Sequence, residues 1–211
     1  MDARVFDVRQ RPIVAWGDYG HVLQHGMGLM LPRRDGFMVL LRTGPFIPPI
    51  TFPGWPSFDT RGSGVVVVDS VRTALESSGL IGLTFQPVLK GRIVWLPWHE
   101  WDLKADRPHF HPPEGEPENY VLEEIHSAKA ADALGDLWEL VPNAIDWIER
   151  QVQLGKDGER TVQFRILQER RDDTDFFCIK PSAMLFCSAR AKEWLESRWS
   201  AWVSLVPLVT V

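Results

Sequence analysis

The sequence predicts an α+β protein with mixed or antiparallel sheets and few short helices, built from two related halves. Three observations lead to this prediction. Short apolar runs with strand-like composition are spread along the 211 residues. Helical spacing of apolar residues is confined to short segments. One strand–helix–strand pattern occurs twice, once in each half of the chain.

The repeated pattern spans Val65–Val88 and returns at a constant offset of 120 residues as Leu185–Leu208. Each copy has an apolar run, then apolar residues at helical spacing, then an alternating strand that ends in a proline. In the first copy we expect Ser70 to cap the helix and Gly79 to end it. A duplication or a shared structural plan explains the repeat, and a chance likeness between two such units is the alternative.

The other segments complete the expected order. Alternating or apolar runs predict strands at Ala3–Val8, Ile13–Trp16, Phe37–Leu41, Ile93–Leu96, Tyr120–Ile125 and Phe176–Ile179. Two further strands, Ala144–Leu154 and Thr161–Gln168, are expected to form a hairpin around GKDGER. Ala128–Leu140 predicts a helix that Gly135 weakens. No segment has the composition of a linker, so residues 1–110 and 111–211 are expected to pack as one body.

Composition limits the class of protein. A formal net charge of −5 argues against binding nucleic acid through phosphate neutralisation. Cys178 and Cys187 lie in apolar segments outside any CxxC motif, which favours buried, reduced thiols in a cytoplasmic protein; a disulfide between them is the alternative. The N-terminus lacks the apolar core of a secretory signal, and no apolar run approaches the roughly 18 residues that span a bilayer.

The histidines offer a possible metal site but no complete motif. His99-Glu100 begins like a zinc-protease signature, yet no second histidine follows at the required spacing. His109 and His111 lie two apart, on one side of any extended segment, and combine with His99 or His126 in a hypothetical site. A proline-rich surface loop is the alternative interpretation. We find no recognisable catalytic signature and expect no cofactor.

Charge is distributed unevenly along the chain. Residues 112–146 carry nine acidic side chains and one basic side chain, a net charge of −8. One interpretation is a solvated face formed by a loop and a helix. The other is an acidic surface that attracts a basic partner and accelerates the encounter.

Part of the sequence resembles a known group of proteins. The segments YVLEEIHSAKAADAL and FRILQERRDDTDFFCIKPSAMLFCSARAKEWLES resemble the C-terminal part of bacterial toxin-immunity proteins. The strand–helix–strand unit VDSVRTALESSGLIGLTFQPV resembles the layout of the double-CxxCG immunity family, although this chain has no CxxC pair. The resemblance covers roughly residues 60–210. It implies a small cytosolic protein that binds a cognate toxin and has no catalytic residues.

We therefore expect an immunity protein that occludes the active site of a cognate toxin encoded by an adjacent gene, with neither nucleic acid nor membrane as partner. Acidic residues would mimic the charge of the toxin's substrate and two tryptophans would act as anchors. The predicted contact residues are Glu114, Glu116, Glu118, Glu123, Glu124, Asp172, Asp173, Asp175, Trp98 and Trp101. The alternatives are a metal-dependent enzyme that uses His99, His109, His111 and Glu100 or Glu114, and a non-catalytic interaction module.

Overall fold

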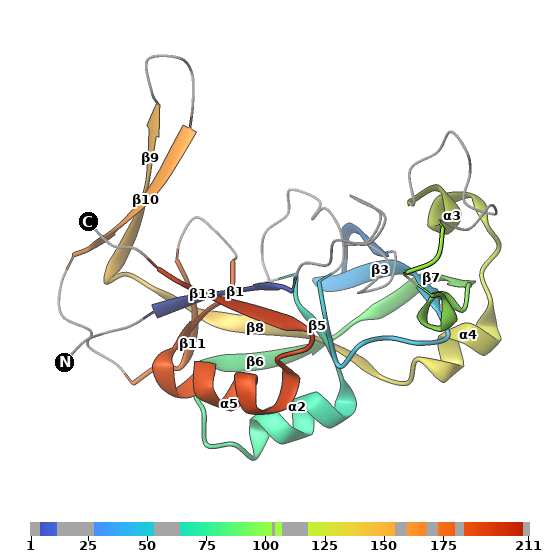
Figure 1. Ribbon diagram of the computed structural model, residues 1–211, viewed down its shortest axis with the longest axis horizontal. Helices are drawn as coiled ribbons and strands as arrows, with labels where there is room; N and C mark the ends of the chain where they lie inside the picture. Colours follow the sequence, from blue (N-terminus) through green and yellow to red (C-terminus); the bar gives the residue numbers. More distant parts are fainter. Residues whose placement is uncertain are drawn as a thin grey trace.

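The computed structural model of the chain describes residues 5–11, 28–52, 64–102, 104–106, 118–154, 160–167, 173–179 and 184–208. It is a mixed α/β structure made mostly of strands, with few short helices (Figure 1). An eight-stranded sheet has the order β13-β1-β12-β11-β8-β5-β4, with β6 also paired to β8, and its seven-strand path is nearly closed and barrel-like. A three-stranded sheet (β2-β3-β7) and a two-stranded ribbon (β9-β10) complete the strands of the described residues.

The elements have the following bounds. The strands are β1 (Val5–Gln10), β2 (Gly28–Arg34), β3 (Phe37–Gly44), β4 (Ile50–Thr51), β5 (Val66–Val68), β6 (Leu83–Pro87), β7 (Leu89–Trp95), β8 (Leu137–Ile145), β9 (Ile148–Leu154), β10 (Arg160–Ile166), β11 (Phe176–Ile179), β12 (Phe186–Ser188) and β13 (Val203–Pro207). The helices are α2 (Asp69–Glu76), the 3-10 turn η1 (Trp98–Glu100), α3 (Glu118–Glu123), α4 (Ala128–Ala133) and α5 (Ala189–Trp199).

The two strand–helix–strand units predicted from the sequence are present. One is β5-α2-β6 and the other is β12-α5-β13, and corresponding strands begin and end 120 residues apart. The helices bury the same two positions, Val71 and Leu75 in α2 and Ala191 and Leu195 in α5. Each helix therefore packs the equivalent apolar side of its surface against the sheet.

Each unit is completed by a third strand that lies between its two strands and runs antiparallel to both. In the first unit this strand is β8, where Trp138 is opposite Val67 on one side and Pro87 on the other. In the second unit it is β1, where Phe6 is opposite Cys187 and Pro207. The partners of Phe6 follow the partners of Trp138 by 120 residues. The two three-stranded groups thus share one pairing register.

Backbone hydrogen bonds repeat in the same register. Leu140 N–H donates to Val65 O and Val8 N–H donates to Leu185 O, both at 2.9 Å. The short strands agree as well, because β4 places Ile50 opposite Val67 and β11 places Phe176 opposite Cys187. The two units therefore correspond in their neighbouring strands as well, β4 beside β5 and β11 beside β12.

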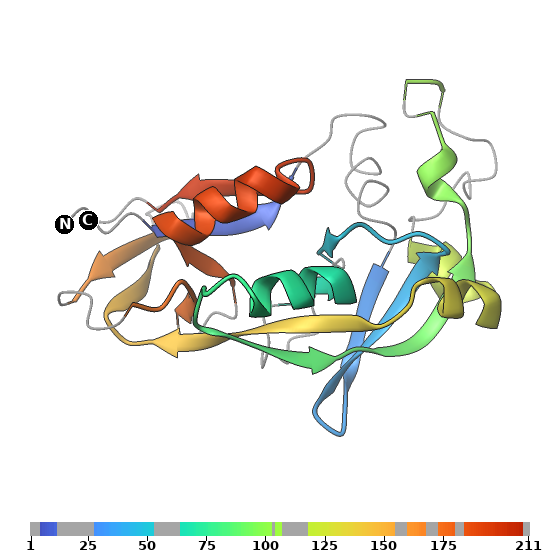
Figure 2. The same cartoon turned by 90° about the horizontal axis from the view of Figure 1, so that it is seen from below.

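The order of elements along the chain also repeats. A first series (β1 to β6) and a second series (β8 to β13) each contain a strand, a hairpin, a short strand and a strand–helix–strand unit. Their opening strands are exchanged: β1 pairs with β12 and β13 of the second series, and β8 pairs with β5 and β6 of the first. β8 also pairs in parallel with β11 of its own series. Figure 2 shows β1 in blue beside the red α5 and β13, and β8 in yellow beside the green α2 and β6.

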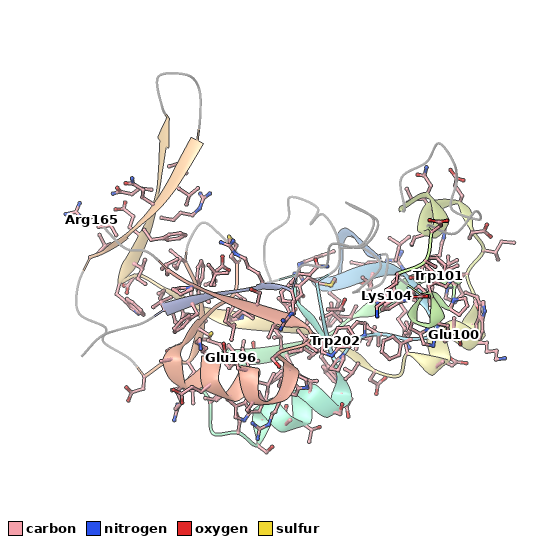
Figure 3. All side chains as sticks on the ribbon, in the orientation of Figure 1. Glu100, Trp101, Lys104, Arg165, Glu196 and Trp202 are labelled. Atoms are coloured by element: carbon pink, nitrogen blue, oxygen red, sulfur yellow. The ribbon has the colours of Figure 1, made fainter. Side chains whose placement is uncertain are left out.

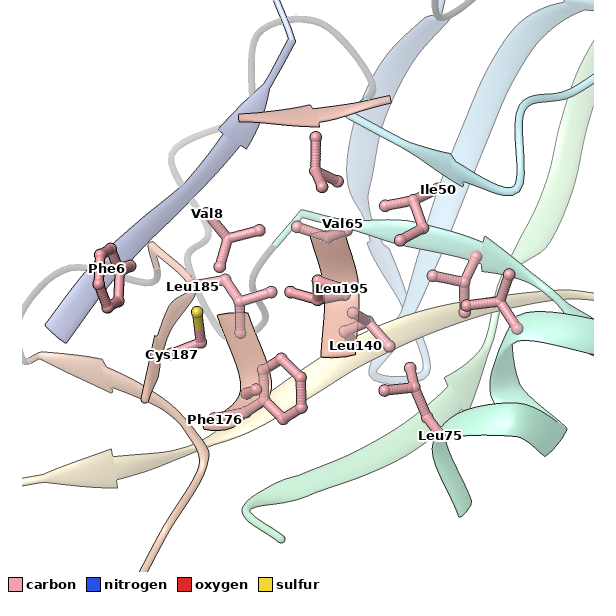
Figure 4. Packing of buried hydrophobic residues seen from close by; sticks show 14 residues of the cluster. Phe6, Val8, Ile50, Val65, Leu75, Leu140, Phe176, Leu185, Cys187 and Leu195 are labelled. Carbon is pink, nitrogen blue, oxygen red and sulfur yellow. The ribbon is translucent and has the colours of Figure 1, made fainter. Parts of the chain in front are cut away.

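The central hydrophobic cluster has the same internal correspondence (Figure 4). Most of its buried members occupy matching positions of the two series, in the pairs Val8 and Leu140, Ile50 and Phe176, Val65 and Leu185, Val67 and Cys187, Val71 and Ala191, and Leu75 and Leu195. The counterparts of buried Phe6 and Val203 are the partly buried Trp138 and Leu83. Both helices and both exchanged strands contribute to this one cluster. Burial of this apolar surface is therefore the main force that joins the two series.

Several predicted segments differ from the structure. Tyr120–Ile125 is wrong as a strand, because the chain forms α3 there and buries Val121 on one helical face. Ala128–Leu140 is wrong as one helix, since α4 ends at Ala133 and β8 begins at Leu137. Gly135 separates them with a φ of +62°, a conformation that glycine adopts at low cost.

The predicted cap of the first helix is also wrong. Ser70 lies inside α2, and the N-cap residue is Val68, which makes no side-chain cap. The corresponding Ser188 does cap α5, where its hydroxyl accepts from the backbone N–H of Ala191. α2 ends at Glu76 with Ser77 as its C-cap, so the helix ends before Gly79, which has the expected left-handed φ of +74° two residues later.

The remaining segment predictions have mixed outcomes. Strands occur where Ala3–Val8, Phe37–Leu41, Ile93–Leu96 and Phe176–Ile179 were expected, although residues 3 and 4 lie outside the described residues. The GKDGER hairpin is β9–β10, but Ala144–Leu154 is wrong as one strand, because β8 ends at Ile145 and β9 begins at Ile148. Ile13–Trp16 lies outside the described residues. Cys187 is buried as predicted, Cys178 is half-buried, and the two thiols form no disulfide. Within the described parts of the chain, no helix is long and apolar enough to cross a membrane.

Candidate partner-binding surface

The predicted acidic residues do not lie on one surface. Glu123 and Glu124 are exposed at the end of α3, whereas Asp173 is exposed just before β11. α3 and β11 lie at opposite ends of the molecule (Figure 1). Glu118 is the first residue of α3. Glu114, Glu116 and Asp172 lie outside the described residues.

Asp175 is buried, with 2% of its surface exposed, and so lies inside the protein instead of on a contact surface. Its carboxylate accepts from the Ser188 hydroxyl at 2.8 Å, from the Ile81 backbone N–H at 3.0 Å and from the Arg190 guanidinium. Burial alone would raise the pKa of Asp175, but these hydrogen bonds and the charge of Arg190 hold it below its ordinary value. Asp175 therefore connects β11 to the start of α5 and to the segment after α2.

Part of the negative charge of residues 112–146 lies inside the protein, where a partner cannot reach it. Glu139 is fully buried, and both of its carboxylate oxygens accept from the guanidinium of Arg33, at 2.6 and 2.8 Å. Its carboxylate is a structural group of the β8 strand. Fewer acidic side chains of this segment are available to a partner than its sequence indicates.

The two tryptophans predicted as anchors differ in exposure. Trp98 is buried, and its ring packs edge to face with Phe46 at a centroid distance of 5.6 Å. Trp101 is half-buried and lies beside Glu100 and Lys104 at the end of the molecule that carries α3 and α4 (Figure 3). Trp98 holds the η1 turn in place, which leaves Trp101 as the tryptophan of the pair with accessible surface.

An apolar surface that the sequence prediction did not include lies at the end of α3. Leu122 and Ile125 are 48% and 85% exposed and flank the exposed Glu123 and Glu124. Arg92 of β7 donates to the carbonyl oxygens of Val121 and Leu122. We name Leu122, Glu123, Glu124 and Ile125 the α3 surface.

The α3 surface continues toward α4 along β7. The ring of Trp95 is exposed, and the Lys129 ammonium lies 5.2 Å from the ring centroid. His126 accepts a hydrogen bond from the backbone N–H of Ile93 at 3.0 Å, which ties the segment between the helices to β7. The alternation that suggested a strand in Tyr120–Ile125 concealed this surface, because a helix exposes a different set of side chains.

The predicted metal site is only partly described. His109, His111 and Glu114 lie outside the described residues. His99 stacks on Phe46 at 5.0 Å, and its Nε2 lies 3.7 Å from Glu100 Oε1. Within the described residues, no group of three histidine, cysteine or acidic side chains is placed to hold a metal ion.

A small pocket lies between α2, β6 and β11. It has a volume of about 280 Å³ and is lined by Leu75, Glu76, Leu80, Ile81, Gly82, Leu83, Phe85 and Phe176. Glu76 is the titratable side chain in this lining, and it accepts from Arg72 of the same helix. The lining supplies no nucleophile and no acid–base pair.

Comparisons with protein-family models, curated proteins and solved structures find no match for this chain.

Proposed function

We propose that this protein is a cytoplasmic immunity protein that binds a cognate bacterial toxin and neutralises it by occluding its active site. The observation that supports the proposal most directly is the α3 surface, where exposed Leu122 and Ile125 flank exposed Glu123 and Glu124. The resemblance to toxin-immunity proteins in the sequence points to the same function.

The α3 surface has the properties of a contact site for a basic protein. Exposed leucine and isoleucine side chains gain free energy when a partner removes them from water. The adjacent carboxylates accelerate association with a positively charged partner and select against an acidic one. The hydrogen bonds from Arg92 fix the end of α3 before binding, which lowers the entropy lost in the complex.

The test is co-expression with the product of the adjacent gene, scored by growth rescue and by co-purification. We expect Leu122→Ala with Ile125→Ala, and Glu123→Lys with Glu124→Lys, each to weaken the complex about tenfold or more. Matched controls at exposed positions elsewhere are Ile81→Ala and Glu193→Lys. Absence of both rescue and a complex with the unaltered protein would exclude this function.

We further infer that the chain arose by duplication of a half of about 100 residues, giving related halves at 1–110 and 111–211. The support is the shared element order and the shared register of the exchanged strands. The two halves expressed as separate chains should then associate, because each carries the strand that completes the other. Two halves that fold alone and remain separate would contradict the exchange.

A further inference from the structure

The β9–β10 ribbon projects from the rest of the protein, with Arg165 near its base (Figures 1 and 3). Its strands pair antiparallel, with Val152 opposite Val162 and Gln151 opposite Gln163. Because side chains alternate between faces, the valine pair and the glutamine pair lie on opposite faces. The ribbon therefore has one polar face and one largely apolar face, on which Val152, Val162 and Phe164 are accompanied by Arg150.

The apolar face extends beyond the part that the core covers. At the base, Phe164 packs edge to face on Phe186 at 5.7 Å, and Ile148 is buried in the same cluster. Toward the tip, Val152 is exposed and Val162 is 41% exposed. A two-stranded ribbon with an uncovered apolar face is marginally stable in water on its own.

The hairpin at the same place in the first series is covered. There β7 adds to β3 as a third, parallel strand. Ile93 of β7 joins Met38 and Leu40 of β3 in a buried cluster, together with Ala130 and Ala131 of α4 and Leu134, the C-cap residue of α4. The strand edge and the apolar face of this hairpin are both occupied by one segment of chain.

The strand-pairing register of β5 and β12 shows that the two hairpins occupy equivalent places. Val66 and Phe186 hold corresponding positions in β5 and β12, opposite Glu139 and Asp7. Val66 lies in the cluster of Met38 and Leu40, and Phe186 contacts Phe164.

The corresponding strands differ in burial. Met38 precedes Leu40 by two residues, as Val162 precedes Phe164, yet Met38 is 2% exposed and Val162 is 41% exposed. Among the described residues, β10 pairs with β9 alone. In the part of the chain that the structure describes, the second series therefore leaves uncovered the edge and face that β7 and α4 occupy in the first.

We propose that the outer edge of β10 and the Val152–Val162 face form a docking site for an extended segment of the toxin. The segment adds as a strand parallel to β10, as β7 adds to β3, and places apolar side chains on the two valines. The backbone N–H and C=O groups of an unpaired edge supply affinity, and the apolar side chains supply specificity. This inference rests on the proposed function, since it assigns a second contact surface to the same partner.

A second copy of the chain fits the site less well. Two copies of β10 related by a two-fold axis perpendicular to the sheet would pair antiparallel. In the first series, by contrast, β7 pairs with β3 in parallel. The parallel precedent favours a segment from a different protein.

The experiment uses the full-length protein co-purified with the product of the adjacent gene. Val152→Lys with Val162→Lys places charge on the apolar face, and Gln151→Lys with Gln163→Lys places the same charge on the polar face of the neighbouring cross-strand pair. We expect the first variant to weaken the complex about tenfold or more and the second less than about threefold. Hydrogen exchange at residues 160–166 should slow in the complex. Circular dichroism checks that both variants are folded.

The outcomes separate the two proposals. A tight complex in which both variants bind equally and residues 160–166 gain no protection would overturn the ribbon site and leave the immunity function intact. Absence of any complex with the unaltered protein would overturn the immunity function and the ribbon site with it. A dimer of the isolated protein that Val152→Lys with Val162→Lys dissociates would identify a second copy as the occupant and overturn the toxin segment.

Discussion

Replacement of Asp175 tests how strongly one buried carboxylate joins distant parts of the fold. Asp175→Ala removes the acceptor for the Ser188 hydroxyl and for the Ile81 backbone N–H. Each donor left without a partner costs about 1–3 kcal/mol. The Arg190 side chain is largely exposed, so its loss adds at most about 1 kcal/mol. We expect Asp175→Ala to lower the free energy of unfolding by about 3–5 kcal/mol, and Asp175→Asn, which keeps one acceptor, by about 2 kcal/mol.

Urea unfolding followed by circular dichroism measures this change. With a slope of about 2–3 kcal/mol per molar urea, Asp175→Asn should lower the transition midpoint by about 1 M at pH 7. Because the pKa of Asp175 is lowered in the folded protein, its contribution is present above the ordinary value of 3.8 and is lost as pH falls through the lower folded value. The deficit of Asp175→Asn should therefore shrink below about pH 3.8.

The control is Asp173→Asn, which removes an exposed carboxylate two residues away. It should change the midpoint by no more than about 0.2 M. If Asp175→Asn and Asp173→Asn have equal effects at pH 7, or if the deficit of Asp175→Asn persists unchanged in acid, the assignment of Asp175 as the joining group is refuted.

Three further predictions concern the core. Leu75→Ala and Leu195→Ala should each lower the free energy of unfolding in urea by about 2–5 kcal/mol, because both leucines are buried at matching positions of one cluster. A loss as small as that of an exposed residue at either site would contradict their equivalent burial. Gly82→Ala should cost at least about 2 kcal/mol, since Gly82 has a φ of +104° and an added Cβ would lie 2.2 Å from the carbonyl oxygen of Phe176; an unchanged melting temperature would contradict this geometry. Burial raises the pKa of Asp7 above 3.8 against the opposing effect of its arginine neighbour, so its contribution is lost as pH rises through the raised value. The stability of Asp7→Asn relative to the unaltered protein should thus increase from pH 3 to pH 7, and a constant difference across this range would contradict the burial cost.

The sequence predicted the local units well because their signals are local. The spacing of Val71 and Leu75, and of Ala191 and Leu195, identifies one buried face on each helix, and the structure buries these four positions. The helix starts were predicted less well. Ser70 has the residue type of a cap, but the helix begins at Asp69, one residue earlier, because the apolar run before it pairs in the sheet as far as Val68.

Pairing between distant strands could not be predicted from local patterns. β1 has the same alternation whether it pairs within the first series or within the second, and no periodicity records that Phe6 lies opposite Cys187 and Pro207. The α3 surface was missed for a related reason. Helix and strand expose different members of Tyr120–Ile125, and tertiary packing of Val121 decided between them.

The buried acids show how the internal correspondence extends beyond apolar residues. Asp7 lies opposite Phe186 and Val206, and Glu139 lies opposite Val66 and Gln86, so the two carboxylates occupy the same place in the register. Both are buried, and each is paired with an arginine: Arg9 on the same strand for Asp7 and Arg33 from β2 for Glu139. A buried carboxylate without a partner would be costly, so each position requires a cation nearby. The position of the acid corresponds while the source of the arginine differs, as expected when packing fixes the site of a charge and any cation within reach can neutralise it.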